Sequence, residues 1–229
     1  MKIVVLTGAG ISAESGIPTF RASDGLWAGY DINDVATYDA WRKDKELVLQ
    51  FYNERRQNAK QAAPNKGHLL LAELEKKHEV TVITQNVDDL HERAGSSKVV
   101  HLHGSLFEAR STLDERLVYD IEGDILIGDK CEKGSQLRPN IVWFGEAVPM
   151  IEKAAEITEE ADIFLIVGTS MLVYPAAGLI HSTKQETPII VVDPNKPDIG
   201  GVLGIHFIEE KASTGMLKAI EIIDQLSKN

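Results

Sequence analysis

The chain has few of the features that mark secreted, zinc-stabilised or membrane proteins. Its 229 residues include one cysteine, Cys131, which excludes an internal disulfide and a multi-cysteine zinc site. No apolar run approaches the ~20 residues that span a bilayer, and the opening run Ile3–Leu6 is too short for a signal peptide. These absences predict a cytoplasmic protein with no membrane partner.

Basic residues are also outnumbered. The chain carries 24 Lys and Arg against 35 Asp and Glu, a formal net charge of −11 at pH 7, which disfavours nucleic acid as a partner. Hydrophobic residues make up 43% of the chain and charged residues 26%, a composition typical of a globular protein with a sizeable core. We expect a monomer with one large domain, or one domain and a small module.

Short apolar runs rich in Val and Ile predict strands that are buried on both faces. They lie at Ile3–Leu6, Val80–Ile83, Ile163–Val167 and Ile189–Val192. Helical patterns occur between and after them, at His68–Lys77, Ile151–Glu160 and Gly215–Leu226. This alternation predicts an α/β fold, a Rossmann-like doubly wound parallel sheet.

Two segments interrupt the alternation of strand and helix. Residues 31–66 contain a helix pattern, Lys45–Lys60, and residues 106–139 hold short mixed pieces rich in glycine. We expect these two insertions to form a small second lobe, with a cleft beside the strand ends. Residues 1–30, 67–105 and 140–229 would then make up the Rossmann-like domain.

A glycine-rich turn follows the first predicted strand. The pattern Gly8-x-Gly10-x-x-Ala13 has the strand-then-helix context of a dinucleotide-binding fingerprint, although alone it fits a structural tight turn equally well. A dehydrogenase of this fold should continue into a second strand that ends in an acidic residue. The chain instead continues as a loop, 15–21, so hydride transfer becomes the less favoured chemistry.

Six motifs along the chain resemble those of one family. They are Gly8-Ala9-Gly10-Ile11-Ser12, Pro18-Thr19-Phe20-Arg21, Thr84-Gln85-Asn86-Val87-Asp88, His101-Leu102-His103-Gly104, Val142-Trp143-Phe144-Gly145-Glu146 and Gly168-Thr169-Ser170. In this order they resemble the sirtuins, NAD-dependent protein-lysine deacylases, from residue 3 to about residue 213. The resemblance implies that NAD is consumed as a co-substrate, that acyl-lysine proteins are the substrates, and that nicotinamide, 2′-O-acyl-ADP-ribose and free lysine are the products.

The resemblance implies that His103, followed by Gly104 at the end of 99–103, is the general base. Histidine suits this role because its unperturbed pKa is about 6.5. The residues alone do not separate it from His101, which would share its strand face at i, i+2. Asn86 and Asp88 are the other catalytic candidates, since amide and carboxylate groups can hold a carboxamide and a ribose. Asp88 could instead cap a helix that starts at residue 89.

The resemblance also places the contacts to NAD. Arg21 is the expected pyrophosphate partner, and Phe20 would shield the reactive sugar carbon from water. The full set of expected cofactor-binding residues is Gly8, Ala9, Gly10, Ser12, Ala13, Glu14, Thr19, Phe20, Arg21, Trp27, Gln85, Asn86, Val87, Asp88, Gly168, Thr169, Ser170, Asn195 and Ala212.

Tyr52 and Arg55 lie at i, i+3 on the predicted helix 45–60 and so project from one face. Such a pair usually means a half-buried tyrosine and a solvated arginine, but Phe51-Tyr52-x-x-Arg55-Arg56 resembles the sirtuin subclass that removes succinyl and malonyl groups. A guanidinium and a phenol suit a carboxylate, and Ala36 would leave room for the longer chain. The remaining expected substrate contacts are Val142, Trp143, Phe144, Gly145 and Glu146.

The chain departs from the family pattern in its small module. Most sirtuins carry two cysteine pairs there that bind zinc, whereas 104–139 contains Cys131 and no histidine, so we expect no metal. The module would fold instead through Leu106, Phe107, Leu117, Val118, Tyr119, Ile121, Ile125, Leu126 and Ile127. The alternatives for the whole chain are an ADP-ribosyltransferase, a general deacetylase, an NAD-binding module without turnover, and a dehydrogenase.

Overall fold

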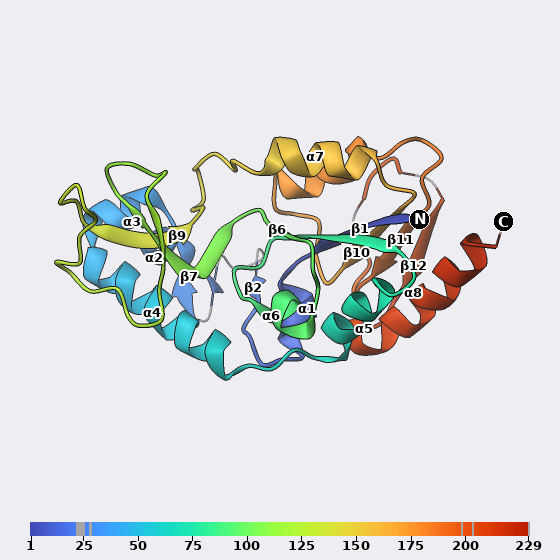
Figure 1. Cartoon of the computed structure of the whole chain (residues 1–229), viewed down its shortest axis with the longest axis horizontal. Coiled ribbons are helices and arrows are strands. Elements are labelled where there is room, and N and C mark those ends of the chain that lie inside the picture. Colours follow the sequence, from blue (N-terminus) through green and yellow to red (C-terminus); the bar gives the residue numbers. More distant parts are fainter. Residues whose placement is uncertain (22–25, 28, 198, 203, 229) are drawn as a thin grey trace.

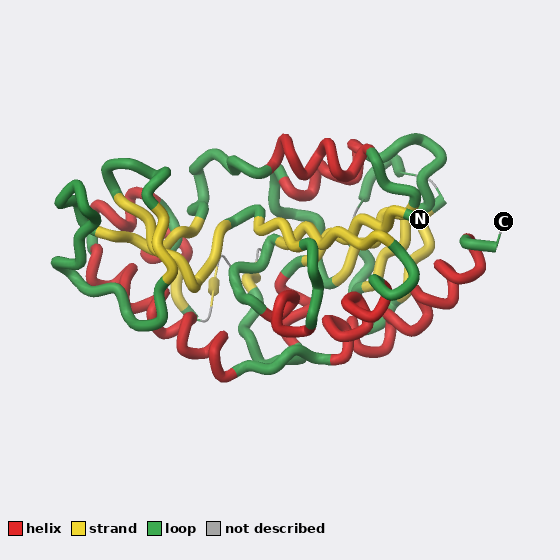
Figure 2. Tube along the Cα trace, in the orientation of Figure 1, coloured by secondary structure: helices red, strands yellow, loops and turns green. Residues whose placement is uncertain are grey.

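The structure, a computed structural model, describes residues 1–21, 26–27, 29–197, 199–202 and 204–228, without the side chains of Phe20, Arg21 and Leu26. It has a large lobe around a parallel sheet and a small lobe that joins it through extended segments (Figures 1 and 2). The predicted α/β fold with a second, smaller lobe is confirmed.

A six-stranded parallel sheet forms the large lobe. Its strands, in spatial order, are β12 (Ile205–Ile208), β11 (Ile189–Val192), β10 (Ile163–Val167), β1 (Lys2–Thr7), β5 (Glu79–Thr84) and β6 (Val99–His101). All four predicted strands are confirmed within β1, β5, β10 and β11. Every residue of β10 and β11 is buried, which explains their continuous apolar runs.

Helices cover both faces of this sheet. On one face lie α5 (Lys66–Leu74) and α8 (Ala212–Leu226), and on the other lie α7 (Ile151–Glu159) and the 3₁₀ helix η1 (Ala176–Ser182) (Figure 1). Helix α5 begins two residues earlier than predicted because the Asn65 side chain caps it by accepting from the Gly67 N–H. Each face carries its own apolar core, with Leu71 and Met216 in one and Ala154 and Ile180 in the other. At about 1.5–3 kcal/mol for each fully buried large aliphatic side chain, these two cores stabilise the lobe.

The strand order reverses between β1 and β10, which are neighbours in the sheet. Open α/β sheets bind ligands in the crevice that such a reversal leaves at the carboxyl ends of the strands. The loops after β1 and β10 touch there, backbone to backbone: the Gly10 N–H donates to the Gly168 carbonyl at 2.8 Å. A Cβ atom on Gly10 would lie 2.7 Å from that oxygen, and Gly168 has φ of +64°. These positions therefore require glycine.

The small lobe is built from the two insertions. Its helices are α2 (Ile32–Val35), α3 (Tyr38–Lys43) and α4 (Lys45–Gln61), and its antiparallel sheet consists of β8 (Val118–Asp120), β7 (Gly104–Ser111) and β9 (Leu137–Ile141). Three further short strands, β2 (Phe20–Arg21), β3 (Leu26–Trp27) and β4 (Tyr30–Asp31), form a second antiparallel sheet, and the short helices α1 (Ala9–Ala13) and α6 (Leu90–Ala94) belong to the large lobe. The predicted helix 45–60 is confirmed as α4.

The predicted core of the small module is partly wrong. Leu106 and Ile125 are buried against α4, but Val118, Leu126 and Ile127 are 43%, 59% and 52% exposed. The reason is geometric: β7, β9 and the loop around Ile125 pack against α4, whereas Val118 lies on β8 at the edge of the three-stranded sheet, and the side chains of Leu126 and Ile127 are left on the surface. Apolar character alone does not show which face of so small a sheet is covered.

Polar contacts complete the small module. The Arg56 guanidinium donates to the carbonyls of Leu106 and Gly123 and to Asn53 Oδ1, which ties α4 to the second insertion. Cys131 is buried, with its Sγ 3.2 Å from Ser135 Oγ. Within the described ranges, no three His, Cys, Asp or Glu side chains are grouped as metal ligands, so the absence of zinc stays a prediction. Among those same residues, no helix is both long and apolar enough to cross a membrane.

Candidate active site

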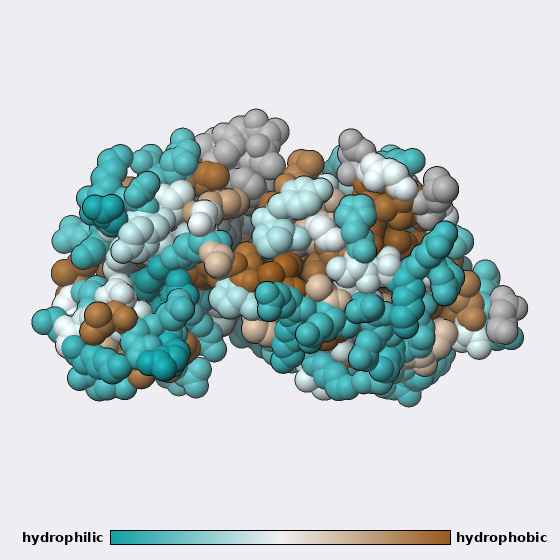
Figure 3. All heavy atoms as spheres, turned by 90° about the horizontal axis from the view of Figure 1, so that it is seen from above, coloured by the Kyte–Doolittle hydropathy of each residue, from teal (hydrophilic) through white to brown (hydrophobic). Residues whose placement is uncertain are grey.

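A cavity of about 780 Å³ lies where the strand order reverses and extends into the small lobe. Seen from above, apolar side chains come to the surface in the hollow between the two lobes (Figure 3). The predicted site residues line this cavity, from Gly8 on the large lobe to Arg55 on the small one. The exceptions are Phe20 and Arg21, whose side chains lie outside the described part of the chain.

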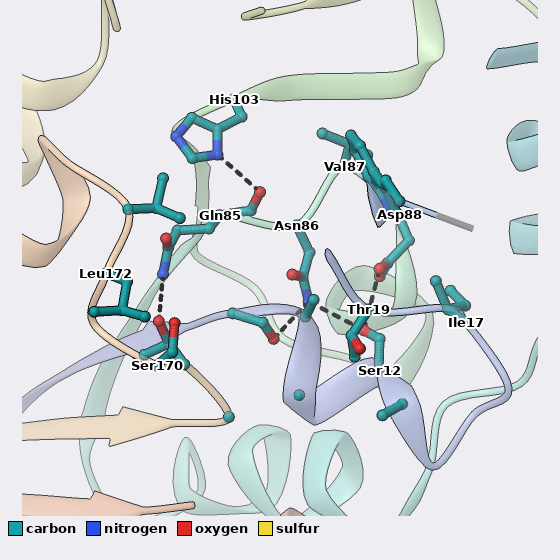
Figure 4. A pocket seen from close by; sticks show the side chains of 18 of the residues that line it. Ser12, Ile17, Thr19, Gln85, Asn86, Val87, Asp88, His103, Ser170 and Leu172 are labelled. Atoms are coloured by element: carbon teal, nitrogen blue, oxygen red, sulfur yellow. Dashed lines mark hydrogen bonds between the residues drawn. The ribbon is translucent and has the colours of Figure 1, made fainter. Parts of the chain in front are cut away.

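The loop after β5 carries the densest polar network in the cavity (Figure 4). Asn86 donates from its side-chain amide to the Gly8 carbonyl and to Ser12 Oγ, both at 3.1 Å. Ser12 in turn donates to Asp88 Oδ2 at 3.1 Å. This relay fixes the Asn86 amide with its nitrogen inward, so its oxygen is the atom left to contact a ligand.

Asp88 both makes the helix contact that the sequence offered as an alternative and faces the cavity. Its Oδ1 accepts the Leu90 N–H at 3.2 Å, which satisfies the first turn of α6, while its Oδ2 accepts from Ser12. The side chain lines the cavity and is 5% exposed. Burial raises the pKa of this carboxyl, and the hydrogen bonds from Leu90 and Ser12 oppose that rise.

His103 lies on the opposite side of this network (Figure 4). Its Nδ1 is 3.1 Å from the Gln85 carbonyl, which can only accept, so Nδ1 carries the proton and Nε2 is left with a lone pair. Burial lowers the pKa of the imidazole, and the Gln85 carbonyl opposes this in part. His103 is thus a neutral imidazole at pH 7, the form that a general base requires.

His101 does not share a strand face with His103, as the i, i+2 argument expected. Strand β6 ends at His101, and the chain bends before His103. His101 Nδ1 lies 3.0 Å from the Asn86 carbonyl and its Nε2 lies 2.7 Å from Glu92 Oε1. Unlike His103, it does not line the cavity.

The small-lobe end of the cavity is apolar and contains unsatisfied donors. Tyr52 is fully buried and Arg55 is 7% exposed, and both line the cavity with Ala36, as predicted. The Arg55 guanidinium carbon lies 4.0 Å from the centroid of the Trp27 ring. Among the described residues, four buried polar atoms here lack a hydrogen-bond partner: Tyr52 Oη, Arg55 Nε, Trp27 Nε1 and Trp143 Nε1.

Burial also shifts the pKa values of this pair. It lowers the pKa of Arg55 well below its usual value, to about 10, and Tyr52 and Asp88 counteract this in part. It raises the pKa of the Tyr52 phenol, against the Arg55 charge and the Trp143 indole N–H, which lies near Oη without a hydrogen bond of good geometry. Tyr52 therefore remains a neutral donor, and Arg55 remains a cation without an anionic partner among the described residues.

The segment 142–146 lines the cavity as predicted, but it is not a regular strand. Phe144 forms an isolated bridge with Thr37, and the Val142 N–H donates to the His103 carbonyl at 3.0 Å. The Glu146 carboxylate is engaged by Arg138 at 2.7 and 3.0 Å and by the Trp143 N–H at 2.9 Å. Glu146 therefore holds the segment in shape, a role that the sequence did not suggest.

Other lining residues were missed or only touched upon by the sequence interpretation. Ile17, Pro18 and Val148 line the cavity as apolar surface, and Leu172–Tyr174 lie along it as a loop. His68 and His91 are buried directly behind the site, His68 Nε2 at 3.5 Å from Ser12 Oγ and His91 Nε2 at 3.0 Å from Thr7 Oγ1. For His68, the sequence signal was the spacing Asn65-x-x-His68, which is typical of a capping box at the start of a helix.

Comparisons with known proteins agree with this geometry. Residues 8–175 match the model of the Sir2 family. The NAD-dependent protein deacylase of Bacteroides thetaiotaomicron is 52% identical over 94% of this chain and 94% of its own length, and that of Helicobacter pylori strain 26695 is 50% identical over 94% of each. A crystal structure of a Sir2 homolog–NAD complex superposes with a TM-score of 0.87 at 42% identity, covering 98% of this chain and 90% of that one. The chain belongs to the Sir2 family, the sirtuins.

Proposed function

We propose that this protein is an NAD-dependent protein-lysine deacylase that removes succinyl and malonyl groups in preference to acetyl groups. The deacylase activity is supported by the relatives at 50% and 52% identity, which carry that name along nearly their whole length. NAD as the co-substrate is supported by a family structure in complex with it. The acyl preference comes from the cavity itself.

The observation that carries this preference is the isolated charge of Arg55. A buried guanidinium is normally paired, because its desolvation costs several kcal/mol (~3–5 for an uncompensated charge). Here the described residues supply two aromatic faces, Trp27 and Phe51, and the more distant charge of Asp88, but no acceptor in a hydrogen bond or ion pair with the guanidinium. An acyl group that ends in a carboxylate would provide the missing anion, whereas an acetyl group would not.

Tyr52 completes the receptor for that carboxylate. Its neutral hydroxyl and the Arg55 guanidinium come from one face of α4, three residues apart. Ala36, buried at 1% exposure, leaves the adjacent volume open. Together they offer charge-assisted donors inside an apolar pocket, the setting in which such bonds contribute most.

The residues of the large lobe fit NAD and the reaction. Glycines let the loops after β1 and β10 meet backbone to backbone at the reversal point, where a pyrophosphate binds in folds of this kind. NAD supplies an electrophilic ribose carbon when bound. Asn86 and Asp88 would hold the nicotinamide and ribose, and His103 Nε2 would accept a proton from the ribose hydroxyls.

An ADP-ribosyltransferase and a general deacetylase are the competing functions. Both could use the same large-lobe residues as the proposed deacylase, so the large lobe does not discriminate among these three functions. The unpaired Arg55 argues against a general deacetylase, because an acetyl group would leave that charge uncompensated.

The test is an acyl-peptide panel. Matched succinyl-, malonyl- and acetyl-lysine peptides are incubated with NAD and the products are read by mass spectrometry. We expect loss of 100 Da from the succinyl peptide, in step with nicotinamide release, at a higher kcat/KM than for acetyl (~10-fold or more). A peptide that gains ADP-ribose would favour the transferase, and equal rates on the three peptides would refute the acyl preference.

A further inference from the structure

His101 is bonded in a way that only one protonation state can satisfy. Its Nδ1 lies 3.0 Å from the Asn86 carbonyl and its Nε2 lies 2.7 Å from the Glu92 carboxylate. Both partners are acceptors when Glu92 is ionised, so both ring nitrogens must donate. A neutral imidazole has one N–H and would leave one of these contacts unmade.

Glu92 is ionised in this arrangement. Burial opposes its charge, but the hydrogen bond and the charge of His101 together lower the pKa of Glu92 below its usual value. For His101 itself, burial disfavours the cation, and the Glu92 contact, the Asn86 carbonyl and the Asp88 charge outweigh it, so that its pKa is raised. The two shifts agree on an imidazolium–carboxylate pair.

The pair acts on the segment that contains the catalytic candidates. Asn86 is held at its side chain by Gly8 and Ser12, at its N–H by Thr84 Oγ1 at 3.0 Å, and at its carbonyl by His101. Of these hydrogen bonds to Asn86, the one from His101 has a charged donor. Its cation also favours the ionised form of Asp88, two residues further along.

We propose that His101 is a positioning residue of this enzyme: as an imidazolium clamped by Glu92, it holds segment 85–88 through the Asn86 carbonyl and releases that hold when it loses its proton. This inference rests on the proposed function for its effect on turnover. The hold on the Asn86 carbonyl is complete while His101 is charged. It is lost as the pH rises through the raised pKa of His101. His103, whose pKa is lowered, loses its function at the other end of the pH range.

The groups that face His101 on each packed element are few. Helix α6 contributes Glu92 and His91, and the loop after β5 contributes Asp88 and the Asn86 carbonyl. Burial lowers the pKa of His91 to about 3, so it stays neutral over the whole working range. Glu92 and Asp88 are therefore the charges that set the titration of His101.

The test compares Glu92→Gln with Glu79→Gln. Glu79 is paired with Lys98 at 2.8 Å at the far end of β5, away from the cavity, and serves as the control for loss of an ion pair. We expect Glu92→Gln to shift the alkaline limb of the kcat/KM profile on the acyl peptide to lower pH by about one pH unit, because an adjacent carboxylate changes a pKa by this order. The acid limb, which belongs to His103, should not move. Glu79→Gln should move neither limb.

A second measurement does not depend on turnover. Nitrogen-15 NMR of the imidazoles should show both nitrogens of His101 protonated at pH 7 in the wild-type protein. The backbone amides of residues 85–88 should shift with the midpoint of His101, and Glu92→Gln should lower that midpoint. The proposed clamp would be overturned if His101 were neutral at pH 7. It would also be overturned if the amide shifts of residues 85–88 did not change as His101 titrates. If the wild-type protein removes no acyl group, the proposed function fails and the NMR titration alone decides the role of His101.

Discussion

The substitution Arg55→Met tests whether the buried charge serves substrate selection at the expense of stability. A charge-assisted hydrogen bond contributes about 1.5–3 kcal/mol, so its loss should lower the succinyl-to-acetyl ratio of kcat/KM by roughly 10- to 100-fold. Activity on the acetyl peptide should change little, since that substrate has no carboxylate to bind. The measurement is kcat/KM on both peptides at saturating NAD.

The same substitution should not destabilise the free protein. The fall in the pKa of Arg55 to about 10 corresponds to roughly 3 kcal/mol of disfavoured charge. Methionine removes that charge and keeps much of the apolar volume between Trp27 and Phe51. We therefore expect an unchanged or higher melting temperature without ligand, at about 2–4 °C per kcal/mol for a chain of this size.

Arg56→Met is the matched control. Arg56 is the next residue, is 0% exposed, and donates to two carbonyls and to Asn53, so its removal leaves acceptors unpaired. We expect this variant to melt at a lower temperature and to keep the ratio of succinyl to acetyl activity. If Arg55→Met leaves the ratio unchanged, or destabilises the protein as Arg56→Met does, the assignment of Arg55 as an unpaired substrate receptor is refuted.

Three further predictions follow from the site. Tyr52→Phe should reduce kcat/KM for succinyl peptides about tenfold, the lower end of the range for a hydrogen bond to a charged group, and spare acetyl peptides; equal losses on both would contradict this role. Because burial lowers the pKa of His103, the acid limb of kcat/KM should lie below pH 6.5, and His103→Ala should abolish turnover while calorimetry still detects NAD binding; a limb above 6.5 would argue against His103 as the base. Untagged protein should contain far less than one zinc per chain by elemental mass spectrometry, and stoichiometric zinc would contradict a metal-free small module.

The elements of the large lobe could be predicted because their determinants are local. A strand buried on both faces needs an unbroken apolar run, and β10 and β11 show one that matches the observed bounds residue for residue. Strand β12, Ile205–Ile208, was missed because it is short and its second residue is a histidine. The motifs of the large lobe lie around one cavity because they follow the carboxyl ends of β1, β5, β6 and β10, whereas segment 142–146 follows β9 of the small lobe and meets them there.

What could not be predicted depends on contacts between distant residues. Nothing in a sequence shows that a buried arginine lacks a partner, so the unpaired state of Arg55 became visible only in the fold. The same holds for His101 and His103, which the sequence could not separate: one meets Glu92 and the other does not. The engagement of Glu146 by Arg138 also needed the folded segment, although both lie within nine positions of each other.

The two lobes contribute different residues to the cavity. Tyr52 and Arg55 are on one helix of the small lobe, whereas Asn86, Asp88 and His103 stand on loops of the large sheet. If the proposed function holds, exchanging the α4 pair would alter which acyl chain is accepted without changing the residues that face the dinucleotide. In such an enzyme, selectivity could evolve or be engineered through a few substitutions on one face of a single helix, with the residues of the large lobe unchanged.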